Sequence, residues 1–260
     1  MTDPDELARH YCDSPAAHIY ALVDLEEPFW SASQWYRRGQ AVVGLVQIPG
    51  DPVKTLYAVS TRDPEATLSL IIDLLPHLGS GTLITGPLGL ADAVEPRRSV
   101  AWSGPHLRYH LVDRAQKPVT GPRSLTPDAG GLRPVELGPA HADDIGALYA
   151  TEPGAAFYRR SMLDDDSFVG VFDDGDLVAA AGTHVLSSVQ GVAAIGAVYT
   201  RPSHRGQGLG RLVTAGVIQR LTDRVTTIGL NVAEANTPAR HIYQQLGFEP
   251  ILAYEELELA

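Results

Sequence analysis

A glycine-rich segment between an apolar run and a helical pattern constrains this chain more than any other feature. The stretch RPSHRGQGLGRL, residues 201–212, follows the apolar run GVAAIGAVYT and leads into LGRLVTAGVIQRL, whose apolar residues recur at helical spacing. Gly206, Gly208 and Gly210 have no Cβ atom to hinder a ligand and can adopt positive φ. A strand that turns directly into a helix directs several backbone N–H groups toward one point. We therefore predict an anion site that binds phosphate.

Two arginines beside the glycines strengthen this prediction and narrow it. Arg205 and Arg211 offer forked donors that match phosphate oxygens. The chain contains no GK triplet ending in Ser or Thr, so it lacks a P-loop for ATP or GTP. A dinucleotide fingerprint would need glycine at position 211 and a parallel unit, whereas this segment follows an expected antiparallel hairpin. A nucleotide-binding oxidoreductase is therefore disfavoured.

The second half of the chain has a regular order of expected elements around this segment. Strand patterns alternate with helical ones, and the DDGD turn joins two strands as a hairpin. We expect strands within 132–138, 167–172, 177–187, 191–200, 225–233 and 251–259, and helices at 141–150, within 152–163, at 209–221 and at 237–247.

The first half repeats the later part of this order. We expect helices at 4–11 and 64–75 and after Gly86, and strands at 41–48, 53–60, 81–85 and 106–113, with the PGDP turn joining the first two. Where the second half has the glycine segment, the first has TRDPEA, which contains no glycine. The sequence therefore predicts related α/β domains of α+β type in tandem, each with a mixed, mostly antiparallel sheet flanked by helices: 1–115, a linker 116–131 and 132–260.

The glycine segment and a second stretch downstream resemble the signatures of the GNAT superfamily of N-acetyltransferases. Arg205, Gly208 and Gly210 fit its R/Q-x-x-G-x-G/A pattern. The stretch NVAEANTPARHIYQQLGFEP contains, in the family's order, Asn236, Ala239, Tyr243 and the pair Gly247–Phe248. The resemblance covers residues 132–260. The two-part layout is similar to the glycine N-acyltransferase-like subgroup, in which a degenerate N-terminal half precedes the working domain, and a tandem GNAT fold is implied.

The resemblance implies acetyl-CoA as co-substrate. In the superfamily, the strand before the loop hydrogen-bonds the pantetheine arm and the loop amides bind the pyrophosphate. The implied cofactor-binding residues are Val198, Tyr199, Thr200, Arg205, Gly206, Gln207, Gly208, Leu209, Gly210, Arg211, Asn236 and Tyr243. Backbone N–H groups near Ala197 and Val198 are expected to stabilise the oxyanion that attack on the thioester creates.

Tyr243 also resembles the superfamily's general acid. A phenol with a pKa near 10 facing a thiol near 8.5 makes complete proton transfer unfavourable by about 2 kcal/mol, so we expect a hydrogen bond that strengthens as the thiolate departs. The alternative is an aromatic ring packed on the inner face of its helix. Many relatives place a carboxylate base on the strand before the loop, and this chain has none there. Glu152, His184, Glu234 and a water chain to solvent are the open alternatives for the base.

Composition argues against several other classes of protein. With 31 acidic and 20 basic residues the formal net charge is -11, which disfavours a nucleic-acid partner. The single cysteine, Cys12, allows no intramolecular disulfide and no cysteine-based metal cluster. His106 and His110 lie on an expected strand without a third ligand, so we expect no metal. No apolar run spans a bilayer and the N-terminus does not resemble a signal peptide, so we expect a cytoplasmic protein without a membrane partner.

The sequence thus favours an acetyl-CoA-dependent N-acetyltransferase that transfers the acetyl group directly to a primary amine of a small molecule or peptide. The alternative is a non-catalytic acyl-CoA-binding sensor or scaffold, which the missing strand carboxylate motivates. We expect a monomer or a homodimer. The residues do not identify the acceptor amine.

Overall fold

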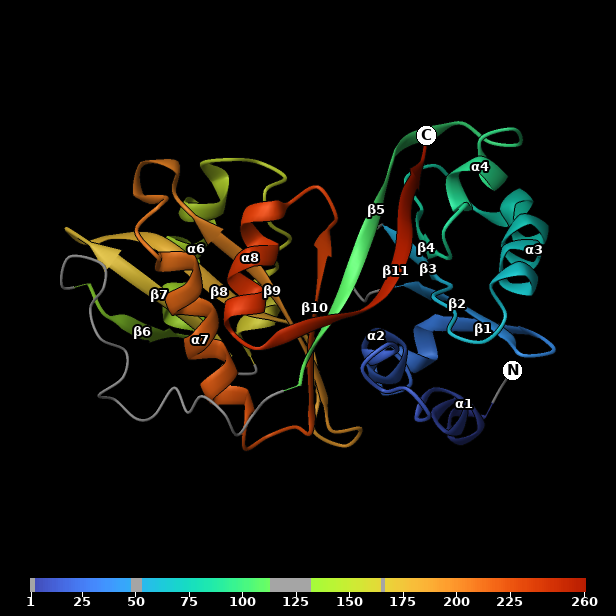
Figure 1. Cartoon of the computed structure of the whole chain (residues 1–260), viewed down its shortest axis with the longest axis horizontal. Coiled ribbons are helices and arrows are strands. Elements are labelled where there is room, and N and C mark those ends of the chain that lie inside the picture. Colours follow the sequence, from blue (N-terminus) through green and yellow to red (C-terminus); the bar gives the residue numbers. More distant parts are fainter. Residues whose placement is uncertain (1–2, 48–52, 113–131, 165–166) are drawn as a thin grey trace. The chain divides into compact units, whose positions relative to one another are not determined.

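The structure, a computed structural model, describes residues 3–47, 53–112, 132–164 and 167–260 (Figure 1). The expected PGDP turn and the expected linker 116–131 lie outside the described residues. Backbone contacts divide the chain into two compact units. Unit 1 comprises Met1–Tyr109, Val232–Thr237 and Pro250–Ala260, and unit 2 comprises His110–Asn231 and Pro238–Glu249.

Unit 1 is a mixed sheet with helices packed on it. Its helices are α1 (Pro4–Tyr11), α2 (Ile19–Val23), α3 (Pro64–Leu74) and α4 (Leu90–Val94). Its strands, in spatial order, are β1 (Ser33–Arg38), β2 (Ala41–Gln47), β3 (Lys54–Tyr57), β4 (Leu83–Gly86), and most of β11 (Phe248–Leu259) and β5 (Val100–Leu111). β1, β2 and β3 form an antiparallel meander, β3 and β4 are parallel, and β11 is antiparallel to β4.

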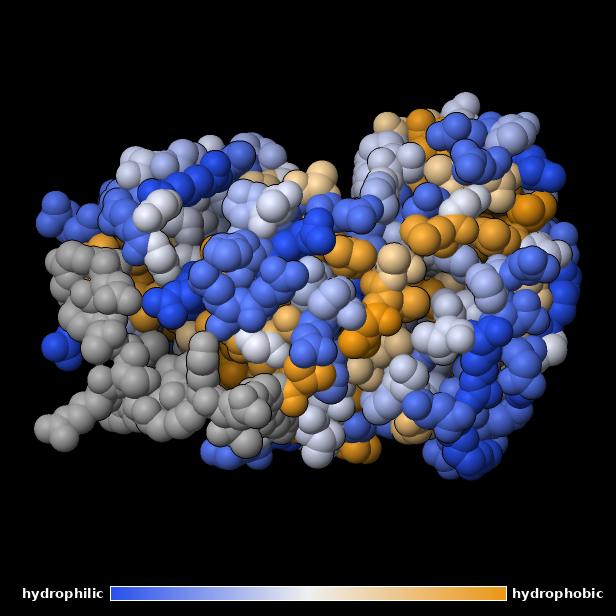
Figure 2. All heavy atoms as spheres, in the orientation of Figure 1, coloured by the Kyte–Doolittle hydropathy of each residue, from blue (hydrophilic) through white to orange (hydrophobic). Residues whose placement is uncertain are grey.

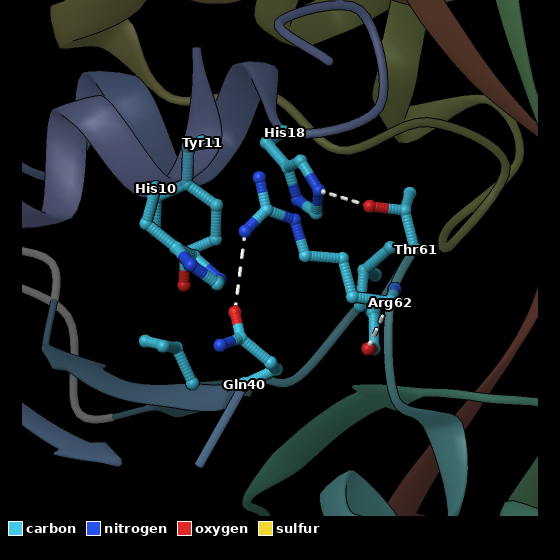
Figure 3. A pocket seen from close by; sticks show the side chains of 9 residues that line it. His10, Tyr11, His18, Gln40, Thr61 and Arg62 are labelled. Atoms are coloured by element: carbon cyan, nitrogen blue, oxygen red, sulfur yellow. Dashed lines mark hydrogen bonds between the residues drawn. The ribbon is translucent and has the colours of Figure 1, made fainter. Parts of the chain in front are cut away.

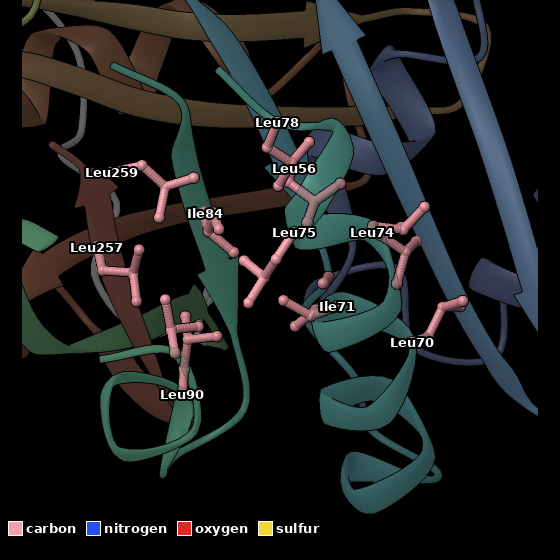
Figure 4. Packing of buried hydrophobic residues seen from close by; sticks show 13 residues of the cluster. Leu56, Leu70, Ile71, Leu74, Leu75, Leu78, Ile84, Leu90, Leu257 and Leu259 are labelled. Atoms are coloured by element: carbon pink, nitrogen blue, oxygen red, sulfur yellow. The ribbon is translucent and has the colours of Figure 1, made fainter. Parts of the chain in front are cut away.

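The core of unit 1 lies between α3 and the sheet (Figure 4). The helix begins at Pro64 behind Asp63, whose side chain accepts a hydrogen bond from the Ala66 N–H at 3.0 Å. Its apolar face packs in one cluster with strand residues that include Leu56, Ile84, Leu257 and Leu259. The last strand of the chain therefore contributes to the core of unit 1.

Sequence patterns missed two elements of unit 1, the short helix α2 and the strand β1. The aromatic stretch PFWSASQWY, residues 28–36, obscured the strand because its apolar residues follow no clear alternation. In β1, Trp35 is paired with Gly44 of β2, and a Cβ atom at Gly44 would lie only 2.6 Å from the Trp35 ring. The indole thus covers a position that requires glycine.

Unit 2 is also a mixed sheet with helices. Its helices are α6 (Ala142–Ala150), α7 (Leu209–Leu221) and most of α8 (Thr237–Gln245). Its strands, in spatial order, are β10 (Thr227–Ala233, mostly in this unit), β9 (Val192–Thr200), β8 (Asp176–Ser187), β7 (Phe168–Asp173) and β6 (Pro134–Leu137). Neighbouring strands are antiparallel except β9 and β10, which are parallel. The predicted α/β class with mostly antiparallel sheet is confirmed.

Two local predictions in unit 2 have different outcomes. The predicted hairpin is present, and Asp174 and Gly175 turn it with φ of 48° and 87°. The expected helix within 152–163 is only a 3₁₀ turn at Arg160–Leu163. Pro153 and Gly154, the latter at φ 84°, lie in the loop before this turn.

Helix α1 is amphipathic. Leu7 and Tyr11 on its inner side are buried. Its outer surface carries hydrophilic side chains (Figure 2). None of the helices among the described residues combines the length and apolar composition needed to cross a membrane.

Candidate functional site

The glycine segment connects β9 to α7 and uses the backbone freedom of glycine. Gly206 and Gly208 have φ of 79° and 78°, in the left-handed region. Gly208 is the N-cap of α7 and has no side chain with which to cap that helix end. A Cβ atom at either position would meet no atom within 4 Å, so the space beside the first turn of the helix is open. The predicted strand, turn and uncapped helix are therefore present.

The third glycine links this segment to α8. A Cβ atom at Gly210 would lie 3.6 Å from Cδ1 of Ile242 in α8 and 3.7 Å from Oγ1 of Thr200. The end of β9, the start of α7 and the middle of α8 are therefore neighbours. Tyr243 directly follows Ile242 in α8, so it is the neighbour in sequence of a residue that borders the glycine segment.

β9 and β10 pair along only part of their length. The register joins Val192–Ile195 of β9 to Thr227–Leu230 of β10. The remaining residues of β9, 196–200, have no partner in that register between the described strands. One edge of β9 is therefore not paired with β10 directly before the glycine segment, over a stretch that contains the nominated residues Val198, Tyr199 and Thr200.

A backbone irregularity lies in the part of β9 that is not paired with β10. Ala197 has φ of 52°, which is unusual for a residue with a Cβ atom, and the register with β8 shifts between Thr183 and Val185. The Ala197 N–H donates to Nε2 of His184 at 3.1 Å, and the Tyr149 hydroxyl donates to the Ala197 carbonyl at 2.5 Å. Both side chains therefore hold the irregular peptide in place.

His184 is a buried side chain that supports the backbone of β9. Burial lowers its pKa to about 4, although a hydrogen bond to the backbone of Phe157 opposes this shift. The neutral ring uses Nε2 as acceptor for Ala197, so that atom is not available to take a proton while the bond persists. The ring also needs glycine opposite it, because a Cβ atom at Gly196 would lie 2.2 Å from the imidazole.

Glu152 and Arg205 form the polar cluster nearest the glycine segment. They are ion-paired, and about half of each side chain is exposed. The Tyr199 hydroxyl donates to the same carboxylate at 3.2 Å and lies 2.9 Å from the Thr151 hydroxyl. Nε of Arg205 donates to the carbonyl of Thr200 at 3.1 Å. The structure thus brings together three of the nominated side chains.

Tyr243 is buried in α8, with 7% of its surface exposed. Its ring meets the ring of Phe248 edge to face, with centroids 6.2 Å apart. Burial raises the pKa of Tyr243 to about 12. Complete proton transfer to a thiolate with a pKa near 8.5 would therefore cost about 5 kcal/mol, which favours a hydrogen-bonding role over full protonation.

The two remaining nominated residues belong to the other compact unit. Glu234 and Asn236 lie within Val232–Thr237 of unit 1, whereas the other nominated residues lie in unit 2. Both side chains are exposed. The Glu234 N–H donates to the carbonyl of Pro105 at 2.9 Å, and the Asn236 N–H donates to the carbonyl of Ala233 at 2.9 Å.

Sequence reasoning missed Tyr149 and Thr151 as members of the site. Tyr149 follows Ile145 by four residues on the buried face of α6, so its position suggested only core packing. His106, considered and rejected as a metal ligand, lies in β5 with Nε2 3.6 Å from the carboxylate of Glu256. Across the described ranges, no three His, Cys, Asp or Glu side chains are grouped to hold a metal ion.

Comparison with known proteins gives matches in sequence and in fold. Residues 168–257, from β7 to near the end of β11, match the family model described as FR47-like protein. A mycothiol acetyltransferase from Tsukamurella paurometabola is 37% identical over 123 residues. This alignment covers 47% of the chain and 39% of that protein, so the chain matches well under half of the relative's length.

Solved structures extend the likeness over nearly the whole chain. A GCN5-related N-acetyltransferase-like protein from Streptococcus suis has a TM-score of 0.63 at 17% identity, covering 99% of this chain and 98% of that one. A tandem GNAT protein from the clavulanic acid biosynthesis pathway has a TM-score of 0.52 at 16% identity, covering 98% and 95%. The chain thus has a GNAT fold, and its residues 168–257 match the FR47-like family.

Proposed function

We propose that this protein is an acetyl-CoA-dependent N-acetyltransferase that transfers the acetyl group directly to a primary amine of a small molecule or peptide. The observation that carries the proposal is the open, uncapped start of α7 behind Gly206 and Gly208. Backbone N–H groups at such a helix end bind phosphate groups well. The mycothiol acetyltransferase relative supports the choice of an acetyl donor.

The residues present suit acetyl-CoA. The loop from Arg205 to Arg211 offers amides and guanidinium groups to a pyrophosphate. The edge of β9 at 196–200, unpaired with β10, offers N–H and C=O groups that match the amides of a pantetheine arm. When bound, acetyl-CoA supplies the activated acetyl thioester.

Glu152 is the base that the geometry favours among the nominated residues. An alkyl amine with a pKa near 10.4 must lose a proton before it can attack, so an acceptor is needed. His184 already accepts from Ala197, whereas the Glu152 carboxylate is half exposed and paired with Arg205. A phosphate group that draws Arg205 toward the loop frees that carboxylate. The ion pair then links donor binding to the availability of the base.

Tyr243 assists the departing thiolate as a hydrogen-bond donor in this proposal. Its raised pKa keeps the phenol protonated throughout the neutral pH range. A protonated phenol can stabilise developing negative charge on sulfur without giving up its proton.

Acetyl-CoA binding is tested by thermal unfolding of the full chain with and without the ligand. At a concentration one hundred times Kd, a ligand stabilises the folded state by about 2.7 kcal/mol. The variant Gly208→Glu should lose this stabilisation, because it places a carboxylate beside the loop amides and strains a left-handed position. Gly89→Glu is the matched control, since Gly89 is also a left-handed N-cap with an open side, at α4 in unit 1.

The control variant should retain the full acetyl-CoA shift despite similar backbone strain. No shift in the wild type would overturn the proposal. Release of CoA is then assayed with a pooled library of primary amines. Ligand-induced stabilisation without CoA release for any amine would favour the sensor or scaffold alternative over the enzyme.

A further inference from the structure

A small polar cavity lies in unit 1 beside the junction of β3 and α3 (Figure 3). It contains about 200 Å³ of unfilled space, open solvent included. Residues from α1, the start of α2, β2 and the segment after β3 line it. This segment precedes α3 as the glycine segment precedes α7, so the cavity lies at the counterpart of the proposed pyrophosphate loop.

Two buried polar atoms on the cavity wall have no hydrogen-bond partner among the described residues. They are the hydroxyl of Tyr11 and Nδ1 of His18. Tyr11 is 1% exposed and His18 is 4% exposed. A buried polar atom without a partner has lost its hydrogen bonds to water, so a ligand that satisfies both atoms recovers that lost free energy on binding.

Hydrogen bonding on the far side of the His18 ring indicates what Nδ1 offers. Nε2 of His18 lies 3.2 Å from the hydroxyl of Thr61. When that hydroxyl donates to Nε2, the single proton of the neutral ring sits on Nδ1. Burial lowers the pKa of His18 to about 3, with contributions from Arg108, His10 and Arg62, so the ring is neutral. Nδ1 is then a donor on the cavity wall.

Arg62 adds charge to these two donors. Its guanidinium extends toward the rings of Tyr11 and His18 and donates to Gln40 at 3.2 Å (Figure 3). It also pairs with Asp13, whose side chain is 70% exposed. An ion pair with so exposed a carboxylate is weak, so an incoming anion can compete for Arg62. Three donors and one positive charge thus meet at a single small cavity.

We propose that this cavity binds a small oxyanion, a carboxylate or a phosphate group, through the Tyr11 hydroxyl, His18 Nδ1–H and the Arg62 guanidinium. The cavity is small, so a whole coenzyme does not fit. The site is independent of the proposed acetyl-CoA loop. It gives the first half, which lacks the glycine segment, a ligand of its own.

The test is a titration of the full chain with sodium acetate and, separately, sodium phosphate at constant ionic strength, followed by nitrogen–proton correlation NMR. We expect saturable shifts at the backbone amides of Ser60, Thr61 and Arg62 for at least one anion. The anion with the lower Kd distinguishes a carboxylate ligand from a phosphate ligand. Shifts confined to the glycine segment, or no saturable shift at the three named amides, would overturn the proposal.

Two variants and a control test which side chains contribute to anion binding. Arg62→Gln should raise Kd about tenfold, because it removes a charged donor. Tyr11→Phe should raise Kd several-fold, since it removes only the hydroxyl and preserves the ring. Arg38→Gln is the matched control: Arg38 is also an exposed arginine of unit 1, paired with Asp73 at 2.5 Å, and its loss should leave Kd unchanged. An unchanged Kd in both Arg62→Gln and Tyr11→Phe would sink the assignment.

Discussion

β3 and β9 are each the last strand of an antiparallel set and are each followed by a helix, but the two helices begin differently. At α3, Asp63 caps the helix with its own carboxylate. At α7, Gly208 occupies the same position in a left-handed conformation and has no side chain to accept such a hydrogen bond. The start of α3 is thus capped by a carboxylate of the chain itself, whereas the start of α7 is open to an external anion. The difference shows that the N-cap residue decides whether the backbone N–H groups at the start of the helix already have an acceptor.

Both junctions nevertheless keep an arginine in a similar arrangement. Arg62 follows β3 and pairs with Asp13, which comes after α1. Arg205 follows β9 and pairs with Glu152, which comes after α6. The first half therefore lacks the glycines but has an arginine–carboxylate ion pair in a similar arrangement. We infer that side chains replace the backbone as anion donors there.

The largest expected effect tests whether the chemistry belongs to the second half. Tyr243→Phe removes the phenolic donor and should lower kcat about ten- to a hundredfold, with KM for acetyl-CoA nearly unchanged. Tyr36→Phe, which removes a hydroxyl bonded to Gln34 in the first half, serves as the control and should not alter kcat. Steady-state measurement of CoA release compares the two. An undiminished kcat in Tyr243→Phe would remove this residue from the mechanism.

Matched alanine substitutions test whether both sheets rely on glycine beneath an aromatic ring. A Cβ atom at Gly182 would lie 2.3 Å from the Phe168 ring, and one at Gly44 would lie 2.6 Å from Trp35. Each Gly→Ala variant should lose about 1 to 3 kcal/mol of unfolding free energy through overpacking. Urea denaturation measures this. At Gly79 a Cβ atom would meet nothing within 4 Å, so Gly79→Ala should have nearly the wild-type unfolding free energy. A similar loss in Gly79→Ala would show that the destabilisation comes from replacing any glycine and not from overpacking.

A buried neutral histidine in each half predicts an acid-dependent loss of stability. Burial lowers the folded pKa to about 3 for His18 and about 4 for His184, below the unfolded value of about 6.5. Each ring therefore favours the folded state above pH 6.5, and this contribution is lost as the pH falls toward the folded pKa. Between pH 7 and pH 5 each histidine should account for about 2 kcal/mol.

Denaturation curves of His18→Gln and His184→Gln at several pH values measure this loss. Glutamine does not titrate, so each variant should lose less stability than wild type between pH 7 and pH 5. A variant with the wild-type pH dependence would show that the corresponding histidine is not held neutral.

The smallest expected effect concerns the cap of α3. Asp63→Ala removes the side-chain acceptor for the Ala66 N–H and should destabilise the fold by about 1 kcal/mol. The acetyl-CoA-induced shift in the melting temperature should persist, because the glycine segment is unaffected. Asp63→Asn is the conservative variant, since an amide oxygen can also cap, and it should recover most of the lost stability. Equal losses in both variants would indicate that the charge matters more than the cap.

Much of the order of strands and helices was predictable because its signals are local. The apolar run before residue 201, the three glycines and the helical spacing after Leu209 all lie within residues 191–221. The GNAT resemblance rested on the same local segments. The expected helix within 152–163 was wrong in extent, since only Arg160–Leu163 forms a 3₁₀ turn.

The roles of individual side chains were less predictable because they depend on distant partners. The sequence nominated Glu152, Arg205 and His184 separately. It contained no signal that Glu152 pairs with Arg205 across 53 positions, or that His184 accepts from Ala197. Residue type indicates what a side chain can do, whereas its neighbours determine whether a donor or acceptor is free.

The sequence by itself determined the glycine segment, the uncapped helix that follows it and the absence of glycine at the matching position in the first half. Tertiary structure alone decided that β11, the last strand of the chain, lies beside β4 and packs Leu257 and Leu259 into the core of unit 1. The physical reason is that alternating apolar residues specify a strand and its buried face but not its partner, because any strand edge offers the same N–H and C=O groups.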